Sequence, residues 1–173
     1  MKKKYQKPNR FYIMGPSGCG KSFFAKKISK KLNIPIYDLD DYFWIDKYTK
    51  ILPKEKREEK IKKILIRKKW IIEGVYSTNI DNILKKTDLL VWLNYSSKTL
   101  SWRLLTRYLK RKITKGPKEN LKDTVKLIKF SRLYSTKTSR LYKKHKKLRK
   151  KHKVFVVTIK NNKQLNKFLK DLK

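Results

Sequence analysis

The hydrophobic pattern alternates between short apolar runs and longer amphipathic stretches along the whole chain. The short runs are rich in β-branched and aromatic residues, as expected for buried strands of a parallel sheet. These predicted strands are Arg10–Met14, Ile36–Leu39, Trp70–Ile72, Leu89–Leu93 and Val154–Ile159. The stretches with helical spacing are Lys21–Leu32, Lys54–Arg67, Ile80–Lys86, Lys98–Ile113, Glu119–Lys147 and Gln164–Leu172. The alternation predicts a doubly wound α/β fold, with helices on both faces of the sheet and ligands at the carboxyl ends of the strands.

Length and composition predict one domain. A chain of 173 residues with 39% hydrophobic residues is long and apolar enough to build one core. We therefore expect a single domain over residues 1–173, with a short lid region around 103–140 that could hinge at Gly116-Pro117. No apolar run approaches the roughly 18 residues that a membrane helix requires, and the single cysteine agrees with a reducing compartment. We expect a cytoplasmic protein without a membrane partner, of open oligomeric state.

A glycine-rich segment follows the first predicted strand and opens the first predicted helix. It matches the pattern Gly, four residues, Gly-Lys-Ser/Thr, and comprises Gly15, Pro16, Ser17, Gly18, Cys19, Gly20, Lys21 and Ser22. Its glycines allow successive N–H groups to point at phosphate oxygens, and the following helix adds the positive end of its dipole. Lys21 would contact the β and γ phosphates, Ser22 would bind Mg²⁺, and Cys19 would be a small filler. The segment predicts a loop that binds ATP with Mg²⁺, in which Lys21 is also catalytic.

Carboxylates follow the second and third predicted strands, although the chain has only 13 acidic residues. At a strand end, Asp40 or Asp41 can hold water on Mg²⁺ or accept a proton from an attacking hydroxyl. We expect Asp40 to be catalytic and metal-binding and Asp41 to contact the substrate, while Asp38 could point the other way. Glu73 could orient the hydrated metal, and Gly74 would let a substrate approach the backbone. The open alternative is that these acids only cap or terminate local structure.

Arginine is scarce in this chain, so its clustering is informative. Five of the nine arginines lie between Arg103 and Arg140, and the planar guanidinium binds phosphate in a bidentate way that lysine imitates poorly. Arg103 and Arg107 share one predicted helix face with Arg111 and are candidate catalytic residues, whereas a solvated role is equally compatible with Arg111. Arg140 and Trp44 are candidate substrate contacts, with core packing as the alternative for Trp44.

These segments resemble the adenylate-kinase-like P-loop kinases, and more closely the small bacterial branch identified as DNA topology modulation proteins. The resemblance rests on Tyr12–Gly18, Ile34–Trp44, Trp70–Ser77, Asp88–Leu93, and Trp102-Arg103 with Arg107. It implies a three-layer fold with a five-stranded parallel sheet of order 2-3-1-4-5, and ATP on the glycine-rich loop. It also implies an acceptor site near Asp40 and Glu73, and a lid that begins with Arg103 and Arg107 beside the ATP phosphates and carries Arg132 or Arg140 further on.

Two segments depart from the family pattern. Where the family has Asp-Gly-Asn-Tyr, this chain has Glu73-Gly74-Val75-Tyr76, and the loop Thr114–Asn120 lacks an expected arginine. These differences concern the acceptor and the lid and leave the ATP-binding loop intact.

The chain is strongly basic, with 50 Lys and Arg against 13 Asp and Glu and a formal net charge of +37. Such a charge attracts polyanions, including nucleic acid. Most basic residues are lysines spread over almost every segment, which favours a composition bias over a footprint on one face. The leading hypothesis is a kinase that moves the γ-phosphoryl group of Mg-ATP to a nucleotide, nucleoside or similar small acceptor. The alternative is a nucleic-acid-associated ATPase, or a polynucleotide 5′-kinase, that uses the basic surface.

Overall fold

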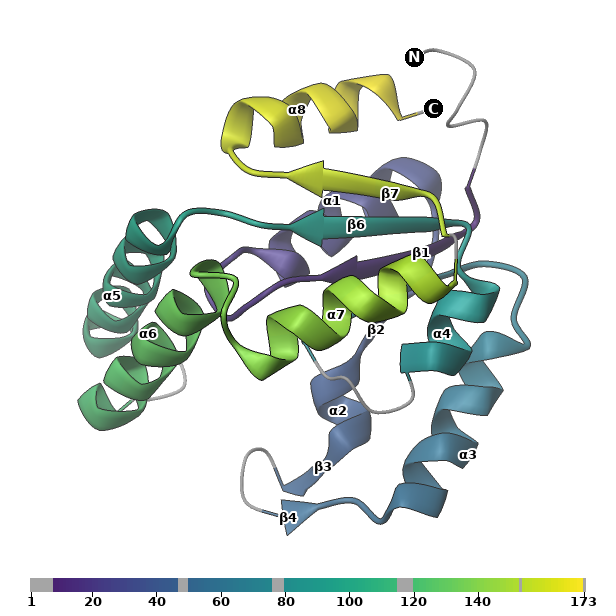
Figure 1. The fold of residues 1–173 in the computed structure, drawn as a ribbon, viewed down its shortest axis with the longest axis horizontal. Helices are drawn as coiled ribbons and strands as arrows, with labels where there is room; N and C mark the ends of the chain where they lie inside the picture. Colours follow the sequence, from purple (N-terminus) through teal and green to yellow (C-terminus); the bar gives the residue numbers. More distant parts are fainter. Residues whose placement is uncertain (1–7, 47–49, 76–79, 115–119, 153, 173) are drawn as a thin grey trace.

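The computed structural model describes residues 8–46, 50–75, 80–114, 120–152 and 154–172. At the centre of this described part lies a five-stranded parallel sheet with the order β2-β5-β1-β6-β7 (Figure 1). Its strands are β1 (Arg10–Met14), β2 (Ile36–Asp38), β5 (Trp70–Gly74), β6 (Leu89–Leu93) and β7 (Val156–Ile159). Counted as the five predicted strands, this order is 2-3-1-4-5. The predicted fold class and strand order are therefore confirmed.

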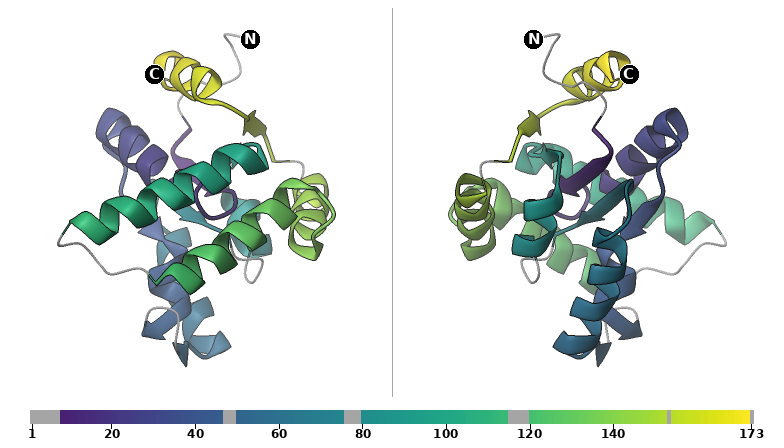
Figure 2. Two further views of the ribbon diagram at one scale, coloured as in Figure 1. Left: turned by 90° about the vertical axis from the view of Figure 1, so that its left-hand side faces the viewer. Right: turned by 90° about the vertical axis from the view of Figure 1, so that its right-hand side faces the viewer.

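Helices cover both faces of the sheet through apolar residues. In the central strand β1, Phe11 and Ile13 point to one face and Tyr12 and Met14 to the other, and none of them is more than 1% exposed. The first face packs against α1 (Lys21–Leu32), α8 (Asn162–Asp171) and the start of α5 (Ser97–Ile113). The opposite face packs against α3 (Lys54–Leu65), α4 (Ile80–Lys86), α7 (Arg140–Lys151) and the end of α6 (Leu121–Ser135). Figure 2 shows α5 and α6 side by side at one end of the sheet.

Three short elements follow β2 that the hydrophobic pattern did not predict. α2 (Leu39–Phe43) begins directly after the strand, and β3 (Trp44–Asp46) pairs antiparallel with β4 (Lys50–Ile51). β2 ends one residue earlier than predicted because Asp38 caps α2: its carboxylate accepts a hydrogen bond of 3.0 Å from the backbone N–H of Asp40. The acidic segment therefore lies at a strand-to-helix junction.

The prediction of a single helix over Glu119–Lys147 is wrong. α6 ends at Ser135 and α7 begins at Arg140, and between them Lys137 has a φ of +64°, a left-handed conformation that interrupts a helix. Ser139 then caps α7, because its hydroxyl accepts a hydrogen bond of 3.1 Å from the N–H of Tyr142. The proposed hinge at Gly116-Pro117 lies outside the described residues.

The helices are amphipathic rather than uniformly apolar. α5, with 17 residues, carries three basic residues in its last turn alone. None of the helices in the described ranges is both long enough and apolar enough to cross a membrane.

Candidate active site

The glycine-rich segment forms the loop between β1 and α1, and its backbone is shaped to surround an anion. Gly18 and Gly20 have φ values of +78° and +88°, which a side chain would strain. The N-cap residue of α1 is Gly20, which has no side chain and so makes no side-chain cap to the first turn of the helix. Lys21, which is half-buried, and Ser22, which is exposed, open the helix beside them. A loop of glycine backbone, a helix N-terminus without a side-chain cap and a lysine fits a nucleotide polyphosphate.

The rear of this loop is packed so tightly that only glycine fits at two positions. A β-carbon on Gly15 would lie 2.6 Å from the carbonyl oxygen of Leu93, and one on Gly18 would lie 2.8 Å from Cγ of Leu104. Cys19 is 1% exposed, and burial raises the pKa of its thiol. A buried, protonated thiol packs rather than reacts, in line with the filler role expected for Cys19.

Helices α5 and α6 hold the loop from outside through its carbonyl oxygens. Arg103 donates one hydrogen bond of 3.1 Å to the carbonyl of Cys19 and another of 2.7 Å to the side chain of Asn162. Its guanidinium also stacks on Tyr95, with 4.1 Å between the guanidinium carbon and the ring centroid. On α6, the buried Ser131 donates to the carbonyl of Ser17 at 2.9 Å. The structure thus brings Arg103 directly to the phosphate loop, and it adds Ser131 and Asn162, which the sequence interpretation missed.

The other predicted arginine and aromatic residues lie further out. Arg107 is half-buried on α5, one turn beyond Arg103, and Arg140 is exposed at the first position of α7. Trp44 is half-buried in β3, with its ring 5.4 Å from that of Phe43. Their contact with a ligand stays a prediction.

A buried carboxylate lies beside the loop, as the strand register requires. Glu73 pairs with Ile13 of β1 on one side and with Asp38 of β2 on the other, and it is only 2% exposed. The hydroxyl of Ser22 donates a hydrogen bond to its carboxylate. Burial raises the pKa of Glu73 to about 7, and the nearby charges of Asp38 and Asp40 add to this, whereas the bond from Ser22 and the charge of Lys21 lower it. These five residues therefore form one electrostatically coupled group.

This group suits a hydrated Mg²⁺ held mainly by phosphate oxygens. Among the described residues, no cluster of three or more His, Cys, Asp or Glu side chains has the geometry of a metal site. Mg²⁺ that arrives with a nucleotide needs only one or two protein oxygens. The hydroxyl of Ser22 is placed where it can supply one, and Glu73 and Asp40 can hold water on such an ion.

An arginine that the sequence interpretation overlooked lies next to the acidic segment. Arg57, on α3, stacks its guanidinium on Phe43 of α2 at 4.5 Å from the ring centroid. Its Nε is buried and has no hydrogen-bond partner among the described residues. Because a buried N–H without an acceptor is costly, this position favours an anion supplied from outside the protein.

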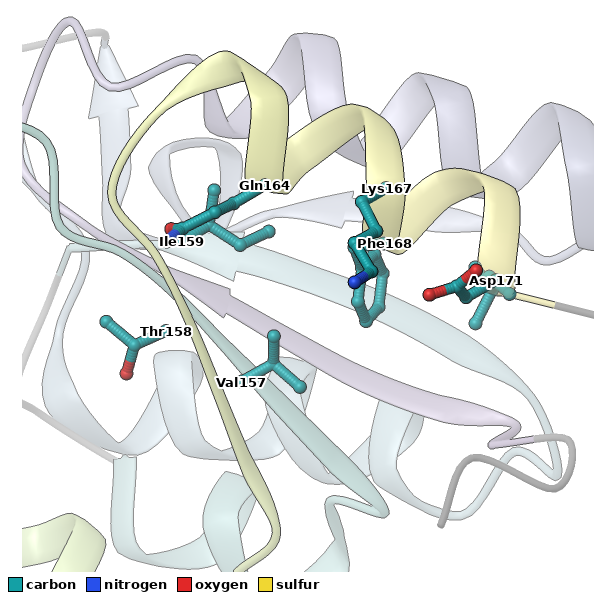
Figure 3. Close-up of a pocket in the computed structure, with 8 residues that line it drawn as sticks. Val157, Thr158, Ile159, Gln164, Lys167, Phe168 and Asp171 are labelled. Carbon is teal, nitrogen blue, oxygen red and sulfur yellow. The ribbon is translucent and has the colours of Figure 1, made fainter. Parts of the chain in front are cut away.

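A hollow of about 250 Å³ lies elsewhere, along the outer edge of the sheet (Figure 3). It is lined mainly by apolar groups of β7 and α8, such as Val157, Ile159 and Phe168, with Lys167 and Asp171 at its margin. None of the predicted site residues lines it. The candidate active site is therefore the surface at the phosphate loop and not this hollow.

Replacing Glu73 with glutamine is expected to change how stability depends on pH. The folded chain, with a pKa of about 7 at Glu73 against its ordinary 4.5, keeps a proton that the unfolded chain releases. Relative to Glu73→Gln, the wild type should therefore lose up to about 3 kcal/mol of its free energy of unfolding as pH rises from about 4.5 through about 7. The opposing contribution of the buried His145, whose folded pKa is about 4, is common to both proteins and cancels in this difference. Urea unfolding across this range measures both, with Glu59→Gln, an exposed glutamate paired with Lys63, as the control. If the free energy of unfolding of Glu73→Gln depended on pH in the same way as that of the wild type, the raised pKa of Glu73 would be contradicted.

The fold has the α/β architecture of the P-loop kinases, and the loop between β1 and α1 matches their phosphate-binding pattern. No protein-family model matches the chain. Among solved structures, it is similar to a shikimate kinase from Bacteroides thetaiotaomicron, with a TM-score of 0.58 and 18% identity over 96% of this chain and 97% of the other. It is also similar to a shikimate kinase from Acinetobacter baumannii in complex with shikimate, with a TM-score of 0.56 and 15% identity over 99% of this chain and 94% of the other. These likenesses establish the fold.

Two curated proteins share parts of the sequence. The uncharacterized protein YqaC of Bacillus subtilis (strain 168) is 37% identical over 83 residues, which is 47% of each chain. The shikimate kinase of Rhodopirellula baltica is 51% identical over 35 residues, which is 20% of this chain and 19% of that protein. The matches thus span less than half the length of either relative. The resemblance to adenylate-kinase-like kinases is supported at the level of the fold, and the resemblance to the DNA topology modulation branch stays a prediction.

Proposed function

We propose that this chain is a kinase that transfers the γ-phosphoryl group of Mg-ATP to a hydroxyl group of a small anionic acceptor. The observation that carries the proposal is the Ser22–Glu73 pair beside Lys21, at the N-terminus of a helix that follows a left-handed glycine loop. The similarity to shikimate kinases, which share the fold, supports a small acceptor over a macromolecular one.

The loop residues position and neutralise the triphosphate. The N–H groups of the loop and of α1 bind the phosphate oxygens, and Lys21 places its charge at the β and γ phosphates. Ser22 would hold Mg²⁺ and Glu73 would hold its water, and the bound ion would supply positive charge that stabilises the charge developing on the transferring group. Arg107, one turn along α5 from Arg103, is proposed to neutralise charge on the transferring group.

The acceptor binds between the loop and the α2–α3 segment. Asp40, in the first turn of α2, accepts the proton of the attacking hydroxyl or orients it in line with the γ-phosphate. Arg57 binds the anionic group of the acceptor, a carboxylate or a phosphate, because its buried Nε lacks an acceptor among the described residues. Asp41, Trp44, Gly74 and Arg140 are proposed to line the remainder of this pocket.

A product panel tests the function. Purified protein is incubated with Mg-ATP and one candidate from each class: shikimate as a hydroxylated carboxylate, nucleoside monophosphates, uncharged nucleosides and 5′-hydroxyl oligonucleotides. We expect a phosphorylated product from an anionic small molecule and none from an uncharged nucleoside. ATP hydrolysis alone, with no acceptor phosphorylated, would contradict the kinase function. Phosphorylation of the oligonucleotide 5′ end would instead show that the acceptor is a polynucleotide and not a small anionic molecule.

The role of Arg57 is tested with the acceptor found in that panel. Arg57→Ala is expected to raise KM for the acceptor by about 10- to 100-fold, with little change in KM for ATP, because a charge-assisted hydrogen bond contributes about 1.5–3 kcal/mol. Arg67, which lies over Tyr37 at 5.8 Å, provides the matched control. An unchanged KM for the acceptor in Arg57→Ala would exclude Arg57 from the pocket.

A further inference from the structure

The solvent side of α7 is composed entirely of cations. Its apolar side, with Tyr142, His145 and Leu148, is buried against the rest of the fold. Every exposed residue of the helix is Lys or Arg, and we call this set the α7 face: Arg140, Lys143, Lys144, Lys146, Lys147, Lys150 and Lys151. No neutral or acidic side chain is exposed on this described helix.

Helix α3 shows that a lysine-rich composition does not by itself produce such a face. α3 also has 12 residues, but it exposes Glu55 and Glu59 among its lysines. Two of its lysines form ion pairs one turn away, Lys63 with Glu59 at 2.7 Å and Lys54 with Glu58 at 3.9 Å. Charges are mixed on α3 and unmixed on α7, so composition bias alone does not account for the α7 face.

The charge imbalance continues around α7. Residues 1–88 contain 23 Lys and Arg against 10 acidic residues, whereas residues 89–173 contain 27 against three. Of those three, Asp123 pairs with Lys126 at 3.3 Å on α6, and Asp171 lies on α8. Within the described ion pairs, the α7 face meets an acidic residue through Lys151, which binds Asp81 of α4 at 2.7 Å. Its other cations therefore face solvent in a strongly positive surrounding.

This arrangement costs folding energy. Like charges four residues apart on a helix, such as Lys143 and Lys147 or Lys146 and Lys150, destabilise it. The buried side of α7 holds the helix in place despite this repulsion. A bound polyanion would remove the repulsion and release its own counterions, which is the driving force of backbone binding to nucleic acids.

We propose that the α7 face binds the phosphate backbone of a nucleic acid without reading its base sequence. A membrane surface does not fit, because the apolar side of α7 is buried and leaves nothing to insert among lipids. A protein interface does not fit either, because such interfaces have an apolar centre and are depleted of lysine. Lysines act as point charges on a repeating line of phosphates, and this is the pattern that α7 presents.

The test compares two variants that remove the same charge from two helices of equal length. The first is Lys143→Gln/Lys147→Gln/Lys150→Gln on α7, and the second is Lys56→Gln/Lys60→Gln/Lys62→Gln on α3. Fluorescence anisotropy measures binding of labelled single-stranded and duplex oligonucleotides of about 20 nucleotides over a range of salt concentrations. Circular dichroism verifies that both variants are folded.

We expect the α7 variant to bind the oligonucleotides at least about tenfold more weakly than the wild type at physiological salt. The slope of the logarithm of the binding constant against the logarithm of the salt concentration should decrease in magnitude by about 3. The α3 variant should change affinity less than about twofold. Equal losses in the two variants would reduce the interaction to overall charge and overturn the proposal. Equally tight binding of the wild type to polyglutamate or to anionic vesicles would also overturn it.

A second measurement uses the wild type alone. Lysine acetylation in the presence of the oligonucleotide should protect Lys143, Lys147 and Lys150 and leave Lys56 and Lys60 reactive. Equal protection of the lysines on α3 and α7 would contradict binding at the α7 face. Because this measurement uses only the wild type, it remains decisive if a variant fails to fold. Neither measurement uses ATP, so the kinase and the α7 face stand or fall separately.

Discussion

Lys21→Ala is expected to lower kcat/KM for phosphoryl transfer by about 100- to 1000-fold, the loss seen when one preorganised group that stabilises transition-state charge is removed. Lys21 is the first residue of α1, between the glycine loop and the Ser22–Glu73 pair. Its charge neutralises the phosphate oxygens as the bond to the leaving group breaks. Steady-state formation of phosphorylated acceptor, with ATP varied at saturating acceptor, measures the effect.

The control for this variant is Lys26→Ala, an exposed lysine on the same helix. It removes the same charge from α1 at a distance from the loop, and its kinetics should match the wild type within about twofold, because surface charges are screened. Thermal unfolding of both variants separates lost chemistry from lost folding. If Lys21→Ala kept more than about a tenth of the wild-type rate, the catalytic role of the loop would be refuted.

Asp40→Asn is expected to lower kcat by about 100- to 10,000-fold with little effect on ATP binding, because general-base assistance of the attacking hydroxyl disappears while the phosphate loop stays intact. Asp40 lies in the first turn of α2, and its charge acts on both Asp38 and Glu73. The same product assay measures kcat, and fluorescence titration with a labelled nucleotide measures binding.

Asp41, the neighbour of Asp40, provides the comparison for the Asp40→Asn variant. Asp41 is exposed and also lies in the first turn of α2, so Asp41→Asn should mainly raise KM for the acceptor. If Asp40→Asn were fully active and Glu73→Gln inactive, the general base would be Glu73 and not Asp40.

The parts of the fold that could be predicted are those with a strong local pattern. β1 and β6 are buried on both faces, so their continuous apolar sequences mark them without reference to the remainder of the chain. The phosphate loop could also be predicted from the sequence, because its positive φ values require glycine and the motif has glycines at those positions. Strand order was reached through family resemblance, since it depends on how distant segments pair.

The residues that prediction missed act across long distances in the chain. Ser131 contacts the loop 114 residues away, and a lone serine in an amphipathic helix carries no signal for such a contact. His145 lies among lysines and carries no motif, yet it is 1% exposed and its Nδ1 lies 2.9 Å from the hydroxyl of Tyr134. Burial lowers its pKa to about 4, so it is a neutral core residue. The spacing of Tyr142, His145 and Leu148 is a helical face that could have revealed this burial.

The contacts of α5 and α6 with the phosphate loop also bear on the order in which the protein matures during synthesis. Arg103 and Ser131 reach the carbonyls of Cys19 and Ser17 from 84 and 114 residues further along the chain. The groups that hold the rear of the loop therefore leave the ribosome well after the loop itself, because synthesis proceeds at about 5–20 residues per second. Strand β1 likewise lacks its neighbour β6 until that strand has been synthesised. A nascent chain that has the whole glycine motif therefore still lacks a rigid phosphate cradle, and the loop reaches its binding shape only once α6 has been made.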